Sequence, residues 1–348
     1  ARAHLALQPC DREPPGSPPM AMLAEGAPAT PAVKGHGLAD ASPSDRERIT
    51  RWAQQYEAVR LAAEFFGRRP RRFRLLPDAP AQALREGQKR VHLMRHGEGH
   101  HNVWRAAEFA AGRTPHAKRG NADEVPPNLH DPCLTEVGMA EARAAQPLTR
   151  DLSPQLLVTS PLRRATQTLL LAFGRSVAEG VPVVAHELCR EAFRGPDPSI
   201  YDSRRSRAEI AAEFPQVDVQ SFVLPELEAP GDQQHRRFLG DPIWWLGDSP
   251  LGSCEGGGLH EAAIVEQAHG FLCWLMSRPE REIGVASHCL FLLALLHGGL
   301  DPGAEGYAGP QVFRTAELRS VVIEEVPAPQ APSSLLGYGP ALMGQAAP

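Results

Sequence analysis

Residues 95–98 carry the most distinctive chemistry of the chain. Arg95-His96-Gly97-Glu98 follows the apolar-rich run 91–94, which predicts a strand that ends at an Arg-His-Gly turn. In open α/β folds, ligands bind at the carboxyl ends of the strands. A guanidinium group fits phosphate oxygens in a bidentate manner, and a neutral imidazole nitrogen can attack phosphorus to form a phosphohistidine. The turn therefore indicates phosphoryl chemistry if other segments complete a phosphate pocket.

Two later segments supply further groups of the same kind. Residues 156–168 predict a buried strand that leads into Ser160-Pro161 and then a helix, with Ser160 as its N-cap. This spacing places Arg163 in the first helical turn, where free backbone N–H groups favour an anion. Residues 282–288 form another apolar run, and it ends in His288. We therefore expect two histidines and two arginines on one rim of the sheet.

The elements around these residues alternate along the chain. A helix is expected from Ser44, because Ser44-Asp45-Arg46-Glu47 has the spacing of a capping box. Further patterns predict a helix near Thr135, a strand over 181–186, an amphipathic helix over 264–275 and a final strand within 311–326. Such alternation favours a three-layer α/β/α fold with a mostly parallel central sheet between helical layers.

Composition divides the chain into successive parts. An Ala-, Pro- and Gly-rich start without periodicity predicts a disordered leader, and a run dense in arginine predicts a basic linker after the first helix. A long, irregular insertion within the main domain is typical of a lid or substrate wall. The expected parts are the leader (1–43), the helix and basic linker (44–90), the main domain (91–326) with its insertion at about 195–258, and a loose Pro-rich tail (327–348).

Five ordered motifs resemble the histidine phosphatase superfamily, which has the phosphoglycerate mutase-like fold. The motifs are Arg95-His96-Gly97-Glu98 with Asn102, Leu134-Thr135-x-x-Gly138, the segment 159–168, Arg190-Glu191 and Ser287-His288. The resemblance covers roughly 91–299. Within the superfamily, the segments 96–102 and 202–206 and the pair Phe214-Pro215 are most similar to plant and fungal phosphoglycerate mutase-like proteins.

The resemblance implies a role for each matched residue. His96 would be the nucleophile, and Glu191 would protonate the leaving oxygen and then activate water, as an alkoxide leaving group requires. The residues implied to hold phosphoryl oxygens are Arg95, Arg163 and His288, with Asn102 as a further hydrogen-bond donor. Arg204 and Arg205 lie in the insertion, and by family analogy they are candidates for substrate binding or else plain surface charges.

A metal site is a competing interpretation of the histidines near the motif. His92, His96, His100 and His101 have spacings that a helix could bring together, but Gly97 and Gly99 disfavour a helix there. Arginines can replace the divalent ion that other phosphatases use to neutralise charge. We therefore expect neither a metal nor an organic cofactor.

The overall composition limits the partners. The chain has 348 residues and a formal net charge of −5, so no broad basic field indicates nucleic acid. The longest apolar run, 289–296, is far too short to cross a bilayer. Six cysteines without paired metal spacing suit a reducing compartment, and early acidic residues, which transit peptides usually lack, favour the cytoplasm. The family resemblance implies a small phosphorylated substrate. Whether the leader is a targeting segment stays open, and oligomeric state is not indicated.

Three functional classes follow from the motifs. The first is a metal-independent phosphatase that passes a phosphoryl group from a small ester to His96 and then to water. The second is a phosphoglycerate mutase, although His100-His101-Asn102-Val103-Trp104 departs from the run that true mutases have there. The third is a binding module without catalysis, which would have no chemical need for His96 and Glu191 together. The phosphatase is the favoured interpretation.

Overall fold

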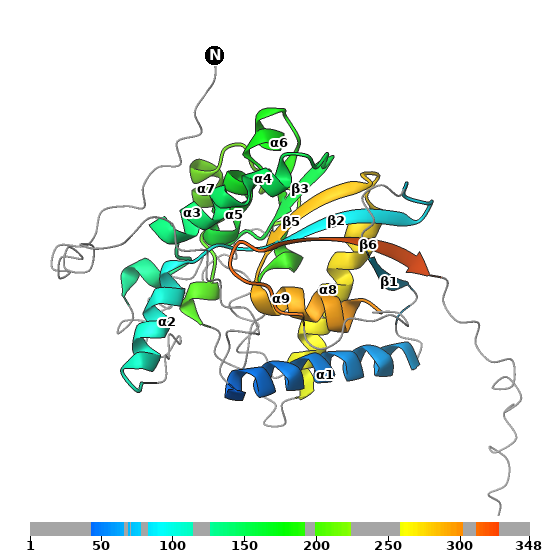
Figure 1. Ribbon diagram of the computed structural model, residues 1–348, viewed down its shortest axis with the longest axis horizontal. Helices are drawn as coiled ribbons and strands as arrows, with labels where there is room; N and C mark the ends of the chain where they lie inside the picture. Colours follow the sequence, from blue (N-terminus) through cyan, green and yellow to red (C-terminus); the bar gives the residue numbers. More distant parts are fainter. Residues whose placement is uncertain are drawn as a thin grey trace, which may run out of the picture.

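The computed structural model describes residues 43–65, 69, 71–77, 83–113, 126–191, 199–223, 258–301 and 311–326. These residues form one six-stranded sheet with helices on both of its faces (Figure 1). The strands are β1 (Arg72–Pro77), β2 (Gln88–Arg95), β3 (Leu156–Thr159), β4 (Val183–Ala185), β5 (Glu282–Ser287) and β6 (Leu318–Val326). The expected leader and Pro-rich tail lie outside the described residues.

The sheet has the strand order β1-β6-β2-β5-β3-β4. Strands β2, β5, β3 and β4 run parallel, whereas β6 is antiparallel to both of its neighbours, β1 and β2. The parallel strands are almost completely buried, as expected for strands covered on both faces. The expected three-layer α/β fold with a mostly parallel sheet is therefore confirmed, and the final strand lies inside the sheet between β1 and β2.

Helices cover the sheet in two layers (Figure 1). Helices α1, α8 and α9 lie on one face, and α3 to α7 lie on the other. The α-helices are α1 (Pro43–Phe65), α2 (His100–Ala110), α3 (Glu136–Ala144), α4 (Gln146–Thr149), α5 (Arg163–Ala172), α6 (Gly174–Ala178), α7 (Arg207–Glu213), α8 (Gly258–Ser277) and α9 (Cys289–Ala294). Short 3-10 turns are η4 (Pro127–Leu129), η5 (Glu187–Cys189) and η6 (Ile200–Asp202), and a π-helical turn, η9 (Leu295–Gly299), extends α9.

The hydrophobic core has two parts, one on each face of the sheet. The larger part joins the strands to α8, α9 and α1, and it contains the fully buried Phe271, Phe291 and Tyr56. The smaller part joins the sheet to α5 and to the 210–223 segment, through Phe173 and Phe214 among others. The helical spacings predicted around Ser44 and over 264–275 therefore face the core as expected.

Residues 72–74 of the basic run lie in a strand rather than in a linker. Arg72–Pro77 forms the edge strand β1, in which Phe73 and Leu75 are buried and alternate with outward-facing arginines. Arg71 makes a bidentate ion pair with Glu325 at 2.7 Å, next to the residue that pairs with Arg72 in β6. Buried and outward-facing residues alternate here, which is the pattern of a strand with one buried face. The many arginines made this alternation hard to recognise in the sequence.

Part of the expected insertion is built into the core. Helix α7 begins at a capping box in which the Ser206 hydroxyl and the Glu209 carboxylate bond to each other's backbone N–H groups. Ile210 and Phe214 behind it are completely buried, and Asp218 bridges to Val184 at the edge of the sheet. The segment 199–223 is therefore part of the main domain. Residues 224–257 of the expected insertion lie outside the described residues.

Candidate active site

The register of the central strands brings the two motif histidines together. Arg95 at the end of β2 pairs with Ser287 at the end of β5, so the next residues, His96 and His288, lie side by side. The His96 backbone N–H donates to the Ser287 carbonyl at 2.9 Å, and the two imidazole centroids are 5.1 Å apart. Both rings are almost completely buried. The expected meeting of two strand-end histidines is present.

A close crossing of two backbone segments fixes the turn after β2. A Cβ atom on Gly97 would come within 2.5 Å of the Gly138 carbonyl oxygen, and one on Gly138 would come within 2.0 Å of the Glu98 carbonyl oxygen. Only glycine allows this approach. Thr135, the N-cap of α3, also donates its hydroxyl to the Glu98 carboxylate at 2.7 Å. The spacing Thr135-x-x-Gly138 therefore serves to hold the turn that carries His96.

Helix α5 holds the same turn from the other side. The Thr168 hydroxyl accepts a hydrogen bond from the Gly97 N–H at 2.9 Å and donates to the Arg164 carbonyl at 2.7 Å. The Gln167 side chain accepts from the Leu134 N–H at 2.8 Å. Ser160 is not the N-cap of this helix, because a further turn intervenes and Leu162 takes that position. The Ser160 hydroxyl instead lies 2.8 Å from Nε2 of His288.

His96 is held as a neutral imidazole with a defined tautomer. Its Nδ1 lies 2.7 Å from the Gly97 carbonyl oxygen, which can only accept a hydrogen bond, so Nδ1 carries the proton and Nε2 keeps its lone pair. Burial lowers the pKa of His96 well below its usual value, and the positive charges of Arg164 and Arg95 lower it further. An unprotonated Nε2 is the form that can attack phosphorus.

Two guanidinium groups lie next to His96. Arg95 donates through Nη1 to the Phe313 carbonyl at 2.9 Å. Arg164, only 1 % exposed, donates to the Tyr201 carbonyl at 2.6 Å and to the Asp202 carboxylate at 2.7 Å. These bonds fix both arginines from outside the motif segments, and η6 supplies both partners of Arg164.

Unsatisfied nitrogen atoms are concentrated around His96. Nε of Arg95, Nε of Arg164 and Nδ1 of His288 are all buried, and within the described part of the chain they have no hydrogen-bond partner. Buried polar atoms in folded proteins normally have partners. Unpaired donors on two cations beside a neutral nucleophile are what an anionic ligand would satisfy. This arrangement fits a phosphoryl group.

Arg163, the arginine expected in the pocket, lies elsewhere. Its guanidinium forms an ion pair with Glu213 of α7 at 2.7 Å, and its backbone N–H donates to Asp131 at 2.8 Å. Arg164, the next residue, has the charge that acts most strongly on His96 and His288 after burial itself. Consecutive helical residues differ by about 100° in direction, so only one of the two arginines can face the strand ends. The spacing within 163–168 could have identified Arg164, because Arg164 and Thr168 are four residues apart and therefore lie on the same face of the helix.

His101 is a third imidazole at the site that motif analysis did not select. It is 4 % exposed, and its ring centroid lies 5.5 Å from that of His96 and 5.2 Å from that of Tyr201. Burial and the charge of Arg164 lower its pKa well below the usual value. The sequence offered it only as part of a metal cluster. His92 instead bonds to Ser320 and Glu282 within the sheet region.

Glu191 and Asn102 both bond to helix N-termini. Oε1 of Glu191 accepts from the N–H groups of Leu290 and Phe291 at 3.2 and 3.1 Å, which holds its carboxyl group at the start of α9, directly after His288. The Asn102 side-chain oxygen accepts from the Gly99 N–H at 2.9 Å and caps α2. The structure thus places Glu191 beside the pocket, while Asn102 uses its oxygen for the backbone.

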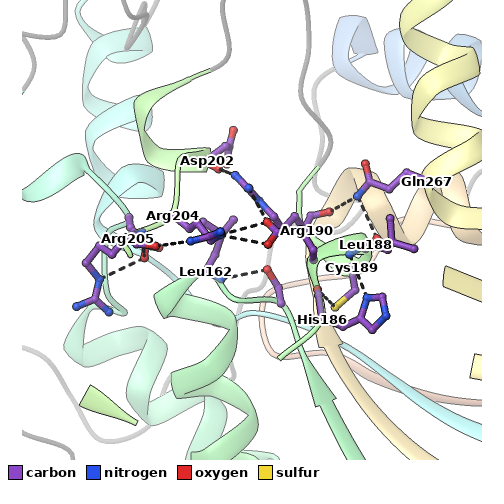
Figure 2. Close-up of polar contacts among 12 residues, drawn as sticks. Leu162, His186, Leu188, Cys189, Arg190, Asp202, Arg204, Arg205 and Gln267 are labelled. Atoms are coloured by element: carbon purple, nitrogen blue, oxygen red, sulfur yellow. Dashed lines mark hydrogen bonds and ion pairs between the residues drawn. The ribbon is translucent and has the colours of Figure 1, made fainter. Parts of the chain in front are cut away.

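Arg204 and Arg205 are engaged in ion pairs (Figure 2). Arg204 is fully buried, 3.3 Å from both carboxylate oxygens of Glu187, and Glu187 also binds Arg190 at 2.8 Å. Arg205 lies 2.7 Å from Glu213 and 3.4 Å from Asp131. These arginines therefore connect the 199–223 segment to the rest of the domain, which a count of charges in the sequence could not show.

A chain of hydrogen bonds runs through the centre of this region. Figure 2 shows Arg190 between the Asp202 segment and Gln267. Arg190 donates to the Asp202 carbonyl at 2.7 Å, and Gln267 of α8 donates to the Arg190 carbonyl at 3.1 Å. Because Asp202 in turn binds Arg164, this chain links α8 to the guanidinium beside His96. Arg190 and Asp202 are positioning residues that the sequence alone did not reveal.

The described segments hold neither a candidate metal cluster nor a membrane-spanning helix. These segments contain no group of three or more His, Cys, Asp or Glu side chains that could hold a metal ion. None of their helices is both long enough and apolar enough to span a bilayer. Cys189 and Cys273 are free thiols, whereas Cys133 is in a disulfide bond.

The fold and the strand-end residues define the class of phosphoglycerate mutase-like α/β proteins. Residues 91–236 match the sequence model of the histidine phosphatase superfamily (branch 1). The chain therefore carries a histidine phosphatase superfamily domain. The matched range contains His96, Arg164 and Glu191 and ends before His288.

Several known proteins are similar to this chain. A "Phosphoglycerate mutase-like protein" of Arabidopsis thaliana is 29% identical over 240 residues, which cover 60% of this chain and 73% of the relative. The structure of a putative alpha-ribazole-5'-P phosphatase from Escherichia coli is 18% identical, covers 67% of this chain and 89% of its own, and has a TM-score of 0.36. The ecdysone phosphate phosphatase of Bombix mori is 11% identical over 70% of this chain and 94% of its own, with a TM-score of 0.40.

Proposed function

We propose that this protein is a phosphatase that hydrolyses a small phosphate ester through a phosphohistidine on His96. Membership of the superfamily supports catalytic phosphoryl transfer. The observation that carries the proposal is the neutral, buried His96, whose Nδ1–H is bound to the Gly97 carbonyl beside two partly unsatisfied arginines. A nucleophile with its lone pair available and two cations for the phosphoryl oxygens is the combination that this reaction needs.

The first half-reaction transfers the phosphoryl group to the protein. Nε2 of His96 forms a bond to phosphorus while the bond from phosphorus to the ester oxygen breaks. Arg95, Arg164 and His288 stabilise the charge that spreads over the phosphoryl oxygens. Glu191, in its protonated form, gives its proton to the leaving oxygen, so that an alcohol departs.

The second half-reaction restores the protein. The Glu191 carboxylate takes a proton from a water molecule, whose oxygen bonds to phosphorus as the bond to Nε2 breaks. Inorganic phosphate leaves, and His96 regains its lone pair. Arginines supply the neutralising charge, so the reaction needs no metal ion.

Phosphate release with a chelator present tests the proposal. The panel contains glycerol 3-phosphate, 3-phosphoglycerate, 2,3-bisphosphoglycerate and sugar phosphates, with His96→Ala as the inactive variant and His92→Ala as a control histidine in the same strand. We expect the wild-type protein and His92→Ala to release phosphate and His96→Ala to lose activity by a factor of at least about 10⁴. Trapped phosphoprotein that is labile in acid and stable in alkali would identify the intermediate.

Two other results would replace this function. Isomerisation of 3-phosphoglycerate with little free phosphate would make the protein a mutase, because a mutase returns the phosphoryl group to its product. Binding of the esters without turnover or phosphoprotein would make it a phospho-ligand binding module.

A further inference from the structure

Arg105 is a cation of the site region that forms no ion pair with a described carboxylate. It lies on α2 one helical turn after His101, so the two side chains share a face of the helix. Its Nε is buried and has no hydrogen-bond partner, and within the described part of the chain no carboxylate forms an ion pair with its guanidinium. The next acidic residue of α2, Glu108, is already bound to Arg113 by two hydrogen bonds of 2.7 Å.

The positive charge of Arg105 acts on three residues near His96. Burial is the main cause that lowers the pKa of His101, and the charge of Arg105 adds to it; burial raises the pKa values of Tyr201 and Asp202 of η6, and the charge of Arg105 opposes that rise. Tyr201 packs against His101, and Asp202 binds Arg164, so all three neighbours surround the phosphoryl site. By contrast, Arg204 and Arg205 are each held within 3.4 Å of carboxylates.

We propose that Arg105, together with His101, forms a second anion subsite next to the phosphoryl pocket, and that the substrate carries a second acidic group, a carboxylate or a further phosphate. This inference rests on the proposed function for the identity of the first group. A half-buried guanidinium that forms no ion pair within the protein can bind carboxylate or phosphate oxygens of a ligand in a bidentate manner. The unpaired Nδ1 of His101 supplies a neutral partner beside it.

The subsite assigns a substrate class. A phosphate monoester of a neutral alcohol fills only the pocket at His96, whereas a phosphorylated acid or a bisphosphate also reaches Arg105. Residues of α2 and η6 therefore distinguish these two kinds of substrate, and they are not the residues that perform the phosphoryl transfer.

Equilibrium binding to a protein that cannot turn over separates this inference from the proposed reaction. In a His96→Ala background, calorimetry measures Kd for two matched pairs, glycerol 3-phosphate with 3-phosphoglycerate and fructose 6-phosphate with fructose 1,6-bisphosphate. We expect the more acidic member of at least one pair to bind about tenfold more tightly or better. Arg105→Leu should bring that ratio to about one, and Arg105→Lys should keep part of it because it retains the charge.

Arg113→Leu is the matched control, since it removes an arginine beyond the end of the same helix that is paired with Glu108. It should leave the ratio unchanged. Equal weakening of both members of each pair by Arg105→Leu, or no preference for the acidic member in either pair, would overturn the subsite. Phosphate release by the wild-type protein from the same esters is measured separately. If no ester is turned over but the ratio of the two Kd values still depends on Arg105, the phosphatase is refuted and the subsite is supported.

Discussion

At the scale of single residues, the site depends on which of two adjacent arginines faces the strand ends. Arg164 is buried against Tyr201 and Asp202, and its charge acts on His96, His101 and His288. Arg163 is 18% exposed and pairs with Glu213. The two residues have the same side chain, so any difference between their variants reports position alone.

Lysine variants of the two arginines test this assignment. Arg164→Lys keeps the positive charge beside Asp202 but loses the fork that holds oxygens in two directions, so we expect kcat to fall by about 10²-fold. Arg163→Lys should change kcat less than about threefold, because its ion pair with Glu213 is remote from the phosphoryl group. Steady-state phosphate release measures both, with circular dichroism to compare folding. Equal losses in the two variants would contradict the assignment of Arg164.

At the scale of elements, the catalytic turn exists because two backbone segments cross almost in contact. Gly97 follows β2 and Gly138 lies in the first turn of α3, and neither has room for a Cβ atom. The Thr135 cap and Thr168 of α5 then bond to the same turn. Three elements distant in the sequence thereby fix the position of one imidazole.

Alanine at the crossing should damage stability and activity together. In Gly138→Ala, the new Cβ would meet the Glu98 carbonyl oxygen at 2.0 Å, so the turn has to move. We expect the free energy of unfolding to fall by at least about 2 kcal/mol and kcat to fall with it. Gly174→Ala is the control, because the nearest atom to its new Cβ is 3.9 Å away and α6 should gain up to about 1 kcal/mol. Urea unfolding and phosphate release measure the two effects, and a Gly138→Ala protein of normal stability would contradict the crossing.

The 199–223 segment is the element that departs most from expectation. A long insertion is typical of a lid or substrate wall, and in the described part of this one η6 holds the arginine beside the nucleophile while α7 fills one side of the core. The apolar residues Ile210, Phe214 and Val217 required a partner surface, and the smaller core part provides it.

At the scale of the whole molecule, buried neutral histidines make stability depend on pH. His186 lies in an aromatic cluster 4.2 Å from Trp274 and accepts a hydrogen bond from the Leu188 N–H through Nδ1. Burial lowers its pKa from 6.5 to about 4. Between these two values the unfolded chain binds a proton that the native protein does not, so stability is fully present above pH 6.5 and is lost as the pH falls toward 4.

The loss assigned to His186 should be about 2 kcal/mol between pH 7.5 and pH 5. His186→Phe keeps an aromatic ring in the cluster and cannot take up a proton. We expect the difference between its free energies of unfolding at the two pH values to be smaller than that of the wild-type protein by this amount. Urea titrations at both pH values measure it. An unchanged difference would show that His186 is not the group responsible.

The sequence by itself determined the architecture and the chemical type of the site. Apolar runs that end in His96, Thr159 and His288 indicate parallel strands, and the carboxyl ends of such strands meet at one edge of a sheet. These features depend on residue type and short spacing, which a single sequence records.

Only the tertiary structure decided which side chains take part. Arg163 and Arg164 have the same side chain, and their directions from the helix axis differ by about 100°. Which of the two faces the strand ends is decided only when α5 packs against the sheet. Arg204 and Arg205 looked available because their carboxylate partners lie far away in the sequence or on another helix. His101 is buried because η6 packs against α2 through Tyr201, and Arg105 on the same face of α2 forms no ion pair with a described residue. Long-range packing sets burial and ion pairing, and a linear pattern contains neither.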